Sequence, residues 1–152
     1  MNRRRLAASL LILSAFAVSG CAEFFRPAPA ALSENEIEGT WAAVEPARGQ
    51  STVTFADEGT ITIDSAVEAI APSSPDPAAV KWDRRLVGTG TWVIADTRHG
   101  TPQRVDFTID DPTSGPQVQA RFWVQGDVGA REIYEVLGDD DSEELFVFEK
   151  QQ

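Results

Sequence analysis

Carboxylates are the reactive side chains that this sequence supplies in the greatest number. The chain has 24 acidic residues against 13 Lys and Arg, which gives a formal charge of −11 at pH 7. An acidic run occupies residues 139–144, and an acidic pair lies at residues 110–111. Oxygen clusters of this kind bind hard cations such as Ca²⁺, although the run lacks the spacing of an EF-hand loop and equally fits a solvated turn. The candidate residues for a ligand or cation mouth are Asp110, Asp111, Asp139, Asp140 and Asp141.

Other reactive groups are scarce in this chain. One Cys and one His are present, so disulfide frameworks, Cys-rich zinc sites and paired-His metal centres are excluded. The sequence also contains no Gly-x-Ser-x-Gly nucleophile motif. The acidic balance argues against a nucleic-acid partner, because few Lys and Arg are available to contact phosphates. We therefore expect a protein that is not an enzyme, uses no cofactor or metal and binds no nucleic acid.

The single Cys, Cys21, follows a segment with the three parts of an export signal. Three Arg near the N-terminus precede an apolar stretch that ends at Val18, and the small residues Ser19 and Gly20 close the segment. The apolar stretch is too short to span about 30 Å of hydrocarbon as a permanent helix. The sequence Val18-Ser19-Gly20-Cys21 resembles the bacterial lipobox. The resemblance implies that the signal is cleaved just before Cys21 and that lipid is attached to its thiol.

Lipidation implies a membrane partner and a location on the extracytoplasmic face of the cell membrane, or on the outer membrane in a Gram-negative source. Two or three acyl chains, at about 0.8 kcal/mol per buried CH₂, anchor a protein stably. Removal of the three Arg leaves 10 basic against 24 acidic residues, a charge of −14, which an anionic membrane surface repels. We expect a signal peptide at residues 1–20, a lipid-anchored flexible tether at 21–36 and a single domain at 37–152.

The domain is predicted to consist of eight short β-strands, because apolar and polar residues alternate and turn residues recur at regular intervals. Val105, Phe107 and Ile109, for example, alternate with polar residues. This pattern predicts an all-β fold, an eight-stranded antiparallel up-and-down barrel, with a two-sheet β-sandwich as the alternative. The strands are expected at residues 39–45, 51–55, 60–64, 86–95, 103–110, 117–124, 131–137 and 143–150.

One long segment, residues 65–85, interrupts the series of short loops. It contains several Pro residues and a stretch at 77–85 that is long enough for one or two helical turns. Val80 and Trp82 offer apolar anchors, so we expect a partly ordered lid. In an up-and-down barrel this segment emerges at the same end as the acidic loops, which makes that end the candidate mouth.

Gly39 and Trp41 form a Gly-x-Trp start to the first strand. In an eight-stranded meander this start resembles the lipocalin, or calycin, pattern. The resemblance implies that Trp41 closes one end of the barrel beneath a basic side chain from late in the sheet, which here is Lys150 or Arg131. The first loop is short for that family, and no second lipocalin motif is present.

The interior of such a barrel is just wide enough to be filled by side chains or to hold one small ligand. Two functions follow from these alternatives. The first is a binding or interaction module of the cell envelope, with a filled interior and a protein or cell-wall partner. The second is a lipocalin-like carrier of one small apolar ligand. The aromatic residues expected to point inward are Phe55, Trp92, Phe107, Phe122, Tyr134, Phe146 and Phe148.

Overall fold

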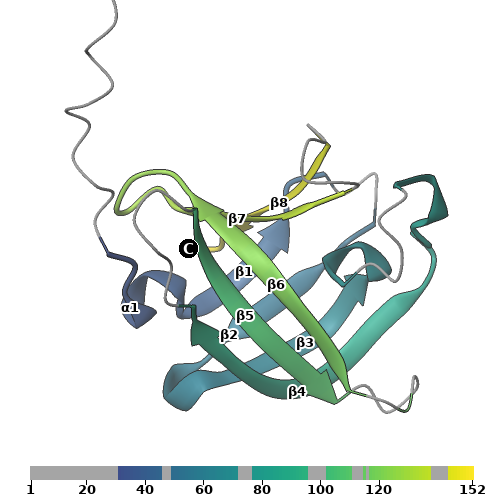
Figure 1. The fold of residues 1–152 in the computed structure, drawn as a ribbon, viewed down its shortest axis with the longest axis horizontal. Coiled ribbons are helices and arrows are strands. Elements are labelled where there is room, and N and C mark those ends of the chain that lie inside the picture. The colour runs from purple at the N-terminus through teal and green to yellow at the C-terminus, as the bar shows by residue number, and fades with distance from the viewer. Residues whose placement is uncertain are drawn as a thin grey trace, which may run out of the picture.

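The computed structural model describes residues 31–45, 49–71, 77–95, 102–110, 115, 117–137 and 144–152. Strands formed by these residues follow one another in chain order around a closed barrel (Figure 1). Each strand is antiparallel to its two neighbours, and β8 pairs with β1 to close the ring. The predicted up-and-down barrel is therefore confirmed, and the sandwich alternative is excluded. The strands are β1 (Gly39–Ala43), β2 (Thr52–Phe55), β3 (Thr60–Val67), β4 (Arg85–Ile94), β5 (Gln103–Asp110), β6 (Val118–Gln125), β7 (Glu132–Val136) and β8 (Leu145–Lys150).

Alternation along the strands separates the buried interior from the outer wall. On β5, Val105, Phe107 and Ile109 are buried, as the sequence predicts. On β7, the prediction that Tyr134 points inward is wrong, because its neighbour Ile133 is fully buried and Tyr134 therefore faces outward. Two large side chains are adjacent on this strand, and its pairing with β6 and β8 decides which of them lies inside.

Aromatic side chains occupy the interior along its length. Phe122 lies in the middle of this series of contacting rings, and it also stacks on Phe107 with 5.0 Å between the ring centroids. These contacts bury large apolar areas and add favourable edge-to-face geometry. The barrel interior is thus occupied by its own side chains. In order along the barrel, the contacting rings are Trp92, Phe55, Phe122, Phe148, Phe146 and Trp82, with centroid separations of 5.0 to 6.4 Å.

The segment between β3 and β4 covers one end of the barrel. It contains two short 3₁₀ turns, η4 (Glu68–Ile70) and η5 (Pro77–Ala79). Ala69 and Ile70 of η4 are fully buried, and the Trp82 ring lies edge-on to Phe146 at 5.7 Å. The helical turn expected within residues 77–85 is present as η5, and the apolar residues of the segment seal this end.

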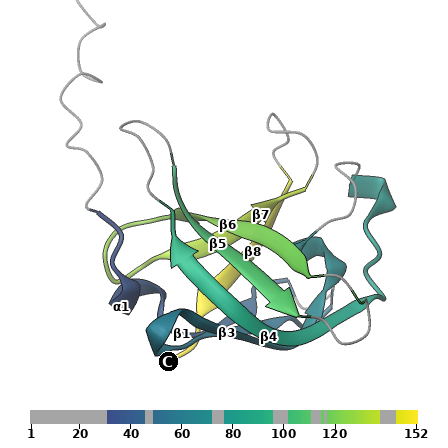
Figure 2. The same cartoon turned by 60° about the horizontal axis from the view of Figure 1, so that its bottom comes forward.

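A short helical turn, α1 (Glu34–Ile37), closes the opposite end of the barrel. Both views of the ribbon place α1 beside the C-terminus, with η4 and η5 at the far end (Figures 1 and 2). Ile37 is fully buried, and the Ser33 backbone N–H donates to the Glu36 carboxylate at 3.0 Å. Residues 34–36, which the sequence assigns to the end of the tether, thus form a helical turn that the burial of Ile37 fixes against the barrel.

Candidate functional site

Of the residues proposed from the sequence for the acidic mouth, the described part of the chain contains Asp110 alone. Asp110 is exposed at the end of β5, and the Gln117 amide donates a hydrogen bond of 2.8 Å to its carboxylate. No group of three acidic, His or Cys side chains suited to a metal ion occurs in the described part of the chain. The predicted residues that lie outside the described part are Val18, Ser19, Gly20, Cys21, Asp111, Asp139, Asp140 and Asp141.

Gly39, Trp41 and Lys150 meet at the α1 end of the barrel. Trp41 is fully buried and its indole N–H donates to the Ile37 carbonyl at 2.7 Å. The Lys150 ammonium lies 5.8 Å from the centroid of the Trp41 ring and donates to the carbonyls of residues 35 and 36 at 3.3 and 3.2 Å. Gly39 has a φ of +127°, and a Cβ there would lie 2.7 Å from Lys150 Cε. These contacts join β1, β8 and α1 at one end of the barrel, which is a structural role.

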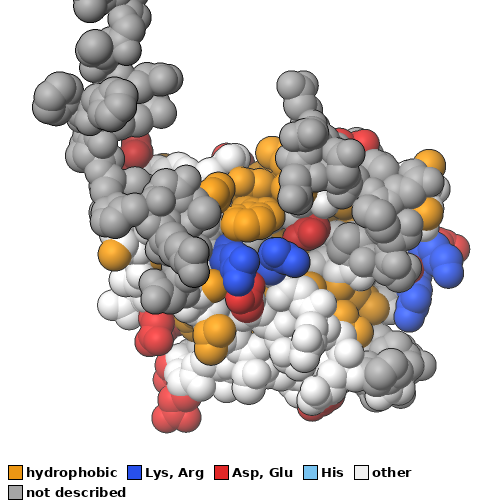
Figure 3. Space-filling model, in the orientation of Figure 1, with side chains coloured by type: hydrophobic (Ala, Val, Ile, Leu, Met, Phe, Trp, Pro, Cys, Tyr) orange, Lys and Arg blue, Asp and Glu red, His pale blue; other side chains and the backbone are white. Residues whose placement is uncertain are grey.

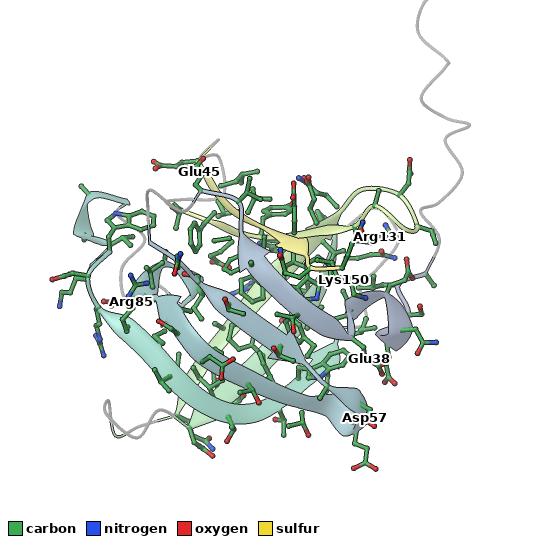
Figure 4. The ribbon with its side chains drawn as sticks, turned by 180° about the vertical axis from the view of Figure 1, so that it is seen from behind. Glu38, Glu45, Asp57, Arg85, Arg131 and Lys150 are labelled. Atoms are coloured by element: carbon green, nitrogen blue, oxygen red, sulfur yellow. The ribbon has the colours of Figure 1, made fainter. Side chains whose placement is uncertain are left out.

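Arg131, the other cation considered from the sequence, lies at the same end of the barrel but binds α1. Its Nε lies 3.0 Å from Glu36 Oε1, and both side chains are largely buried. The hydrogen bond from Arg131, together with the Ser33 N–H, lowers the pKa of Glu36 below its usual 4.5. Figure 4 shows Arg131 and Lys150 side by side near α1. The two cations therefore attach α1 to the barrel from separate places, Lys150 from the end of β8 and Arg131 from the residue that precedes β7.

The outer wall of β4, β5 and β6 is hollowed into a groove of about 490 Å³, which sequence reasoning missed. Figure 3 shows basic side chains gathered on this face, with apolar and acidic side chains around them. Strand register sets the order of the residues. Across the wall, the two central rows are Arg104–Trp123–Tyr134 and Val93–Asp106–Arg121. Beyond these rows the groove is lined by polar side chains from Thr91, Thr108 and Gln119.

Two guanidinium groups in the groove have different surroundings. Arg104 forms a two-point ion pair with Asp106: its Nη2 donates a hydrogen bond of 3.2 Å to Oδ2, and its Nε lies 3.1 Å from Oδ1 without hydrogen-bond geometry. Arg121 has no carboxylate within ion-pair distance among the described residues. Both groups lie over the Trp123 ring, each 5.9 Å from its centroid. Stacking on an aromatic face orients a guanidinium while leaving its N–H donors free in the ring plane.

The seam between β6 and β7 lies beside Arg121 and holds a buried carboxyl group. The two strands are paired from Gln125 as far as Trp123 and no further, whereas β5 and β6 are paired along nearly their whole length. Past the last pair, Glu135 lies on the interior side of β7 opposite the buried Phe146. Its Oε2 is buried without a hydrogen-bond partner among the described residues. Burial raises the pKa of Glu135 to about 8, against a smaller lowering by the positive charge of Arg121.

Part of this groove is visible in the sequence. Alternation on the fifth and sixth strands places Arg104, Asp106 and Arg121 on the outer wall, together with Trp123. A Trp at an outward position is the signal that marks this face, because large aromatic residues are enriched at binding hot spots. The register between the strands decides that the arginines flank that Trp, and no local pattern encodes the register.

Comparison with family models, with curated proteins and with solved structures found no match to this chain. None of the helices that the structure describes has the length and apolar character needed to cross a membrane. The class that the fold defines is thus a closed eight-stranded antiparallel barrel with a filled interior and a groove on its outer wall.

Proposed function

We propose that the protein is a lipid-anchored binding module of the cell envelope that contacts its partner through the outer-wall groove. The observation that carries this proposal is the arrangement of Arg104, Arg121 and Trp123 on one exposed face. Trp and Arg are the residues that most often dominate binding energy at protein interfaces. The domain carries a charge of −14, so two arginines beside one aromatic ring make this face distinct from the rest of an acidic protein.

Location rests on the lipobox-like sequence that ends at Cys21. An acyl anchor holds the chain to the membrane, and the acidic body is repelled from anionic headgroups. The domain, with its groove, is then held in the space beside the membrane, on the extracytoplasmic side. This placement suits an envelope protein as the partner and gives the tether the role of a spacer.

Binding is favoured over catalysis by the chemistry of the groove. Its described lining residues include no Ser, Cys or His, so no activated nucleophile with a paired base is assembled there. Asp106 is engaged by Arg104 in a two-point contact, which suits a structural or recognition role better than proton transfer.

The carrier alternative has less support. A carrier needs interior volume, and the rings from Trp92 to Trp82 are in contact along the barrel. The polar lining of the outer groove is also a poor match for a small apolar ligand. The interior would have to expand before it could accept one.

The test uses position-specific photo-crosslinking in the full-length, membrane-anchored protein. A photoreactive residue replaces Val93, which is 60% exposed beside the groove, and in a matched control it replaces Val128, which is 65% exposed in the turn between β6 and β7. We expect a defined protein adduct from position 93 that is absent from position 128. The same adducts from both positions, or none from position 93, would contradict the proposal.

A second arm separates the groove from the acidic mouth. Replacement of Asp139, Asp140 and Asp141 by Asn should leave the adduct at position 93 unchanged. Loss of the adduct in this triple variant would place the partner at the mouth instead of in the groove.

A further inference from the structure

Arg121 is a cation without a carboxylate partner among the described residues, held on the wall of the groove. Its guanidinium lies over Trp123 at 5.9 Å from the ring centroid, and it lines the groove together with Gln119 on the same strand. A guanidinium oriented in this way presents a planar fork that matches the geometry of a carboxylate. The neighbouring Arg104 is already engaged by Asp106. Arg121 is therefore the group on this face that is available to bind an anion.

The acidic groups that face Arg121 do not cancel its charge at neutral pH. Asp106 is its cross-strand neighbour on β5, and this carboxylate is held by Arg104. Glu135 lies across the seam on β7, and its burial keeps it largely protonated at pH 7, since its pKa is about 8. Glu132, further along β7, accepts a hydrogen bond of 2.8 Å from the Gln125 amide. A local positive charge thus persists on a strongly acidic protein.

The rest of the groove suits a peptide backbone and one apolar side chain. Thr91, Thr108 and Gln119 supply donors and acceptors along the groove. Val93 is 60% exposed next to Asp106 and offers an apolar contact. The volume of about 490 Å³ lies in the range that holds a ligand the size of a few residues.

We propose that the groove binds an extended peptide segment of an envelope protein, with a carboxylate of that segment on Arg121 and an apolar side chain against Val93. This inference rests on the proposed function and names the chemistry of the partner. A sugar polymer fits less well, because the two guanidinium groups over Trp123 occupy the ring surface on which a sugar would stack. A long acidic polymer is disfavoured by the charge of −14 on the mature chain.

The test is a ligand-observed NMR titration of the full-length protein in detergent micelles. The probe is a capped tetrapeptide with the sequence Gly-Glu-Val-Gly, and its matched control carries Gln in place of Glu. We expect the Glu peptide to bind at least fivefold more tightly than the Gln peptide, with the difference shrinking as salt is added. Equal binding of the two peptides would overturn the inference.

Variants of the protein locate the binding. Arg121→Gln should weaken binding of the Glu peptide at least fivefold, and Arg121→Lys should give an intermediate value because it keeps the charge and loses the planar fork. Lys81→Gln, which removes an exposed charge at a residue outside the groove lining, should leave binding unchanged. Thermal unfolding of each variant checks that the fold is retained.

Three further outcomes would overturn the inference. Unchanged binding of the Glu peptide by Arg121→Gln would show that its carboxylate does not contact Arg121. An equal loss of binding in Lys81→Gln would indicate a nonspecific charge effect. Tighter binding of a neutral disaccharide, in competition with the Glu peptide, would assign the groove to a glycan. If the photoreactive residue at position 93 still forms an adduct with a protein partner in any of these cases, the proposed function stands and only the carboxylate assignment fails.

Discussion

Gly39 lies directly against the side chain of Lys150, so that a Cβ on Gly39 would be 2.7 Å from Lys150 Cε. The contact joins the first residue of β1 to the last residue of β8. The Lys150 ammonium lies over Trp41 and donates hydrogen bonds to two α1 carbonyls. A side chain at position 39 would therefore displace the end of Lys150 from these contacts.

Gly39→Ala is expected to destabilise the protein by about 2–3 kcal/mol, from a positive φ combined with displacement of Lys150. The matched control is Gly129→Ala, which also has a positive φ, of +86°, but has nothing within 4 Å of an added Cβ. This control should lose only about 1–2 kcal/mol. Urea unfolding of both variants measures the difference, and equal losses would show that the Lys150 contact has no energetic weight.

The pair between Glu36 and Arg131 predicts a pH dependence at the acidic side. Because the pKa of Glu36 in the folded protein lies below its usual 4.5, the pair's contribution is fully present above pH 4.5 and is lost as pH falls through the folded pKa. Glu36→Gln should therefore be less stable than wild type at pH 7, by about 1–3 kcal/mol, and the two should converge in acid. Urea midpoints from pH 3 to pH 7 test this, and a constant gap would contradict it.

The buried carboxyl group of Glu135 predicts the opposite dependence at higher pH, a stability that falls as pH rises. Its pKa is raised from 4.5 to about 8 by burial, so between these values the folded state binds a proton that the unfolded state has lost. Stability should fall as pH rises through this window, by up to about 1.4 kcal/mol per pH unit. Glu135→Gln should remove the slope and be more stable than wild type at pH 8–9. Glu149→Gln, at an exposed position on β8, is the control and should retain the slope.

Phe122 tests whether the interior is filled. It contacts Phe55, Phe107 and Phe148, so Phe122→Ala should cost about 3–5 kcal/mol and leave a cavity. We expect the wild-type protein to bind no fluorescent fatty-acid probe, and the variant to acquire binding of small apolar molecules. Phe122→Leu, which loses less volume, keeps the experiment informative if the Ala variant does not fold. Stoichiometric probe binding by the wild type would favour the carrier function.

Cys21 predicts the location of the protein. Cys21→Ser should release the protein from the membrane fraction and abolish labelling with a clickable fatty acid. Ser14→Ala, within the export signal, keeps the thiol and should behave as wild type. Retention of both membrane association and labelling in Cys21→Ser would end the lipoprotein hypothesis.

The order and topology of the strands could be predicted because both are encoded locally. Val105, Phe107 and Ile109 alternate with polar residues, and turn residues separate consecutive strands, so an up-and-down meander follows from chain order alone. The same local rule fails at Tyr134, where the adjacent Ile133 is the residue that turns inward. Where two large side chains are adjacent on a strand, the strand alone does not determine which of them points into the barrel, and the pairing with its neighbours does.

The cation that covers Trp41 and the groove around Arg121 could not be predicted, because both depend on contacts between strands that are distant in the sequence. Whether Lys150 or Arg131 covers Trp41 depends on the pairing of Trp41 with Lys150 across the closure. The position of Arg121 beside Trp123 and near Glu135 likewise depends on where β6 and β7 separate. Alternation along β6 indicates that Arg121 faces outward, but a local pattern does not place residues of different strands in one groove.

The bond from Lys150 to the Glu36 carbonyl spans 114 positions of the chain. A barrel closed by its first and last strands can finish folding only after the C-terminal strand has been delivered, because loop closure over so long a separation precedes any gain from the contact. During synthesis the barrel therefore stays open until β8 has been made. The same bond then makes β8, the last strand of the barrel to be made, the strand that fixes α1 in place.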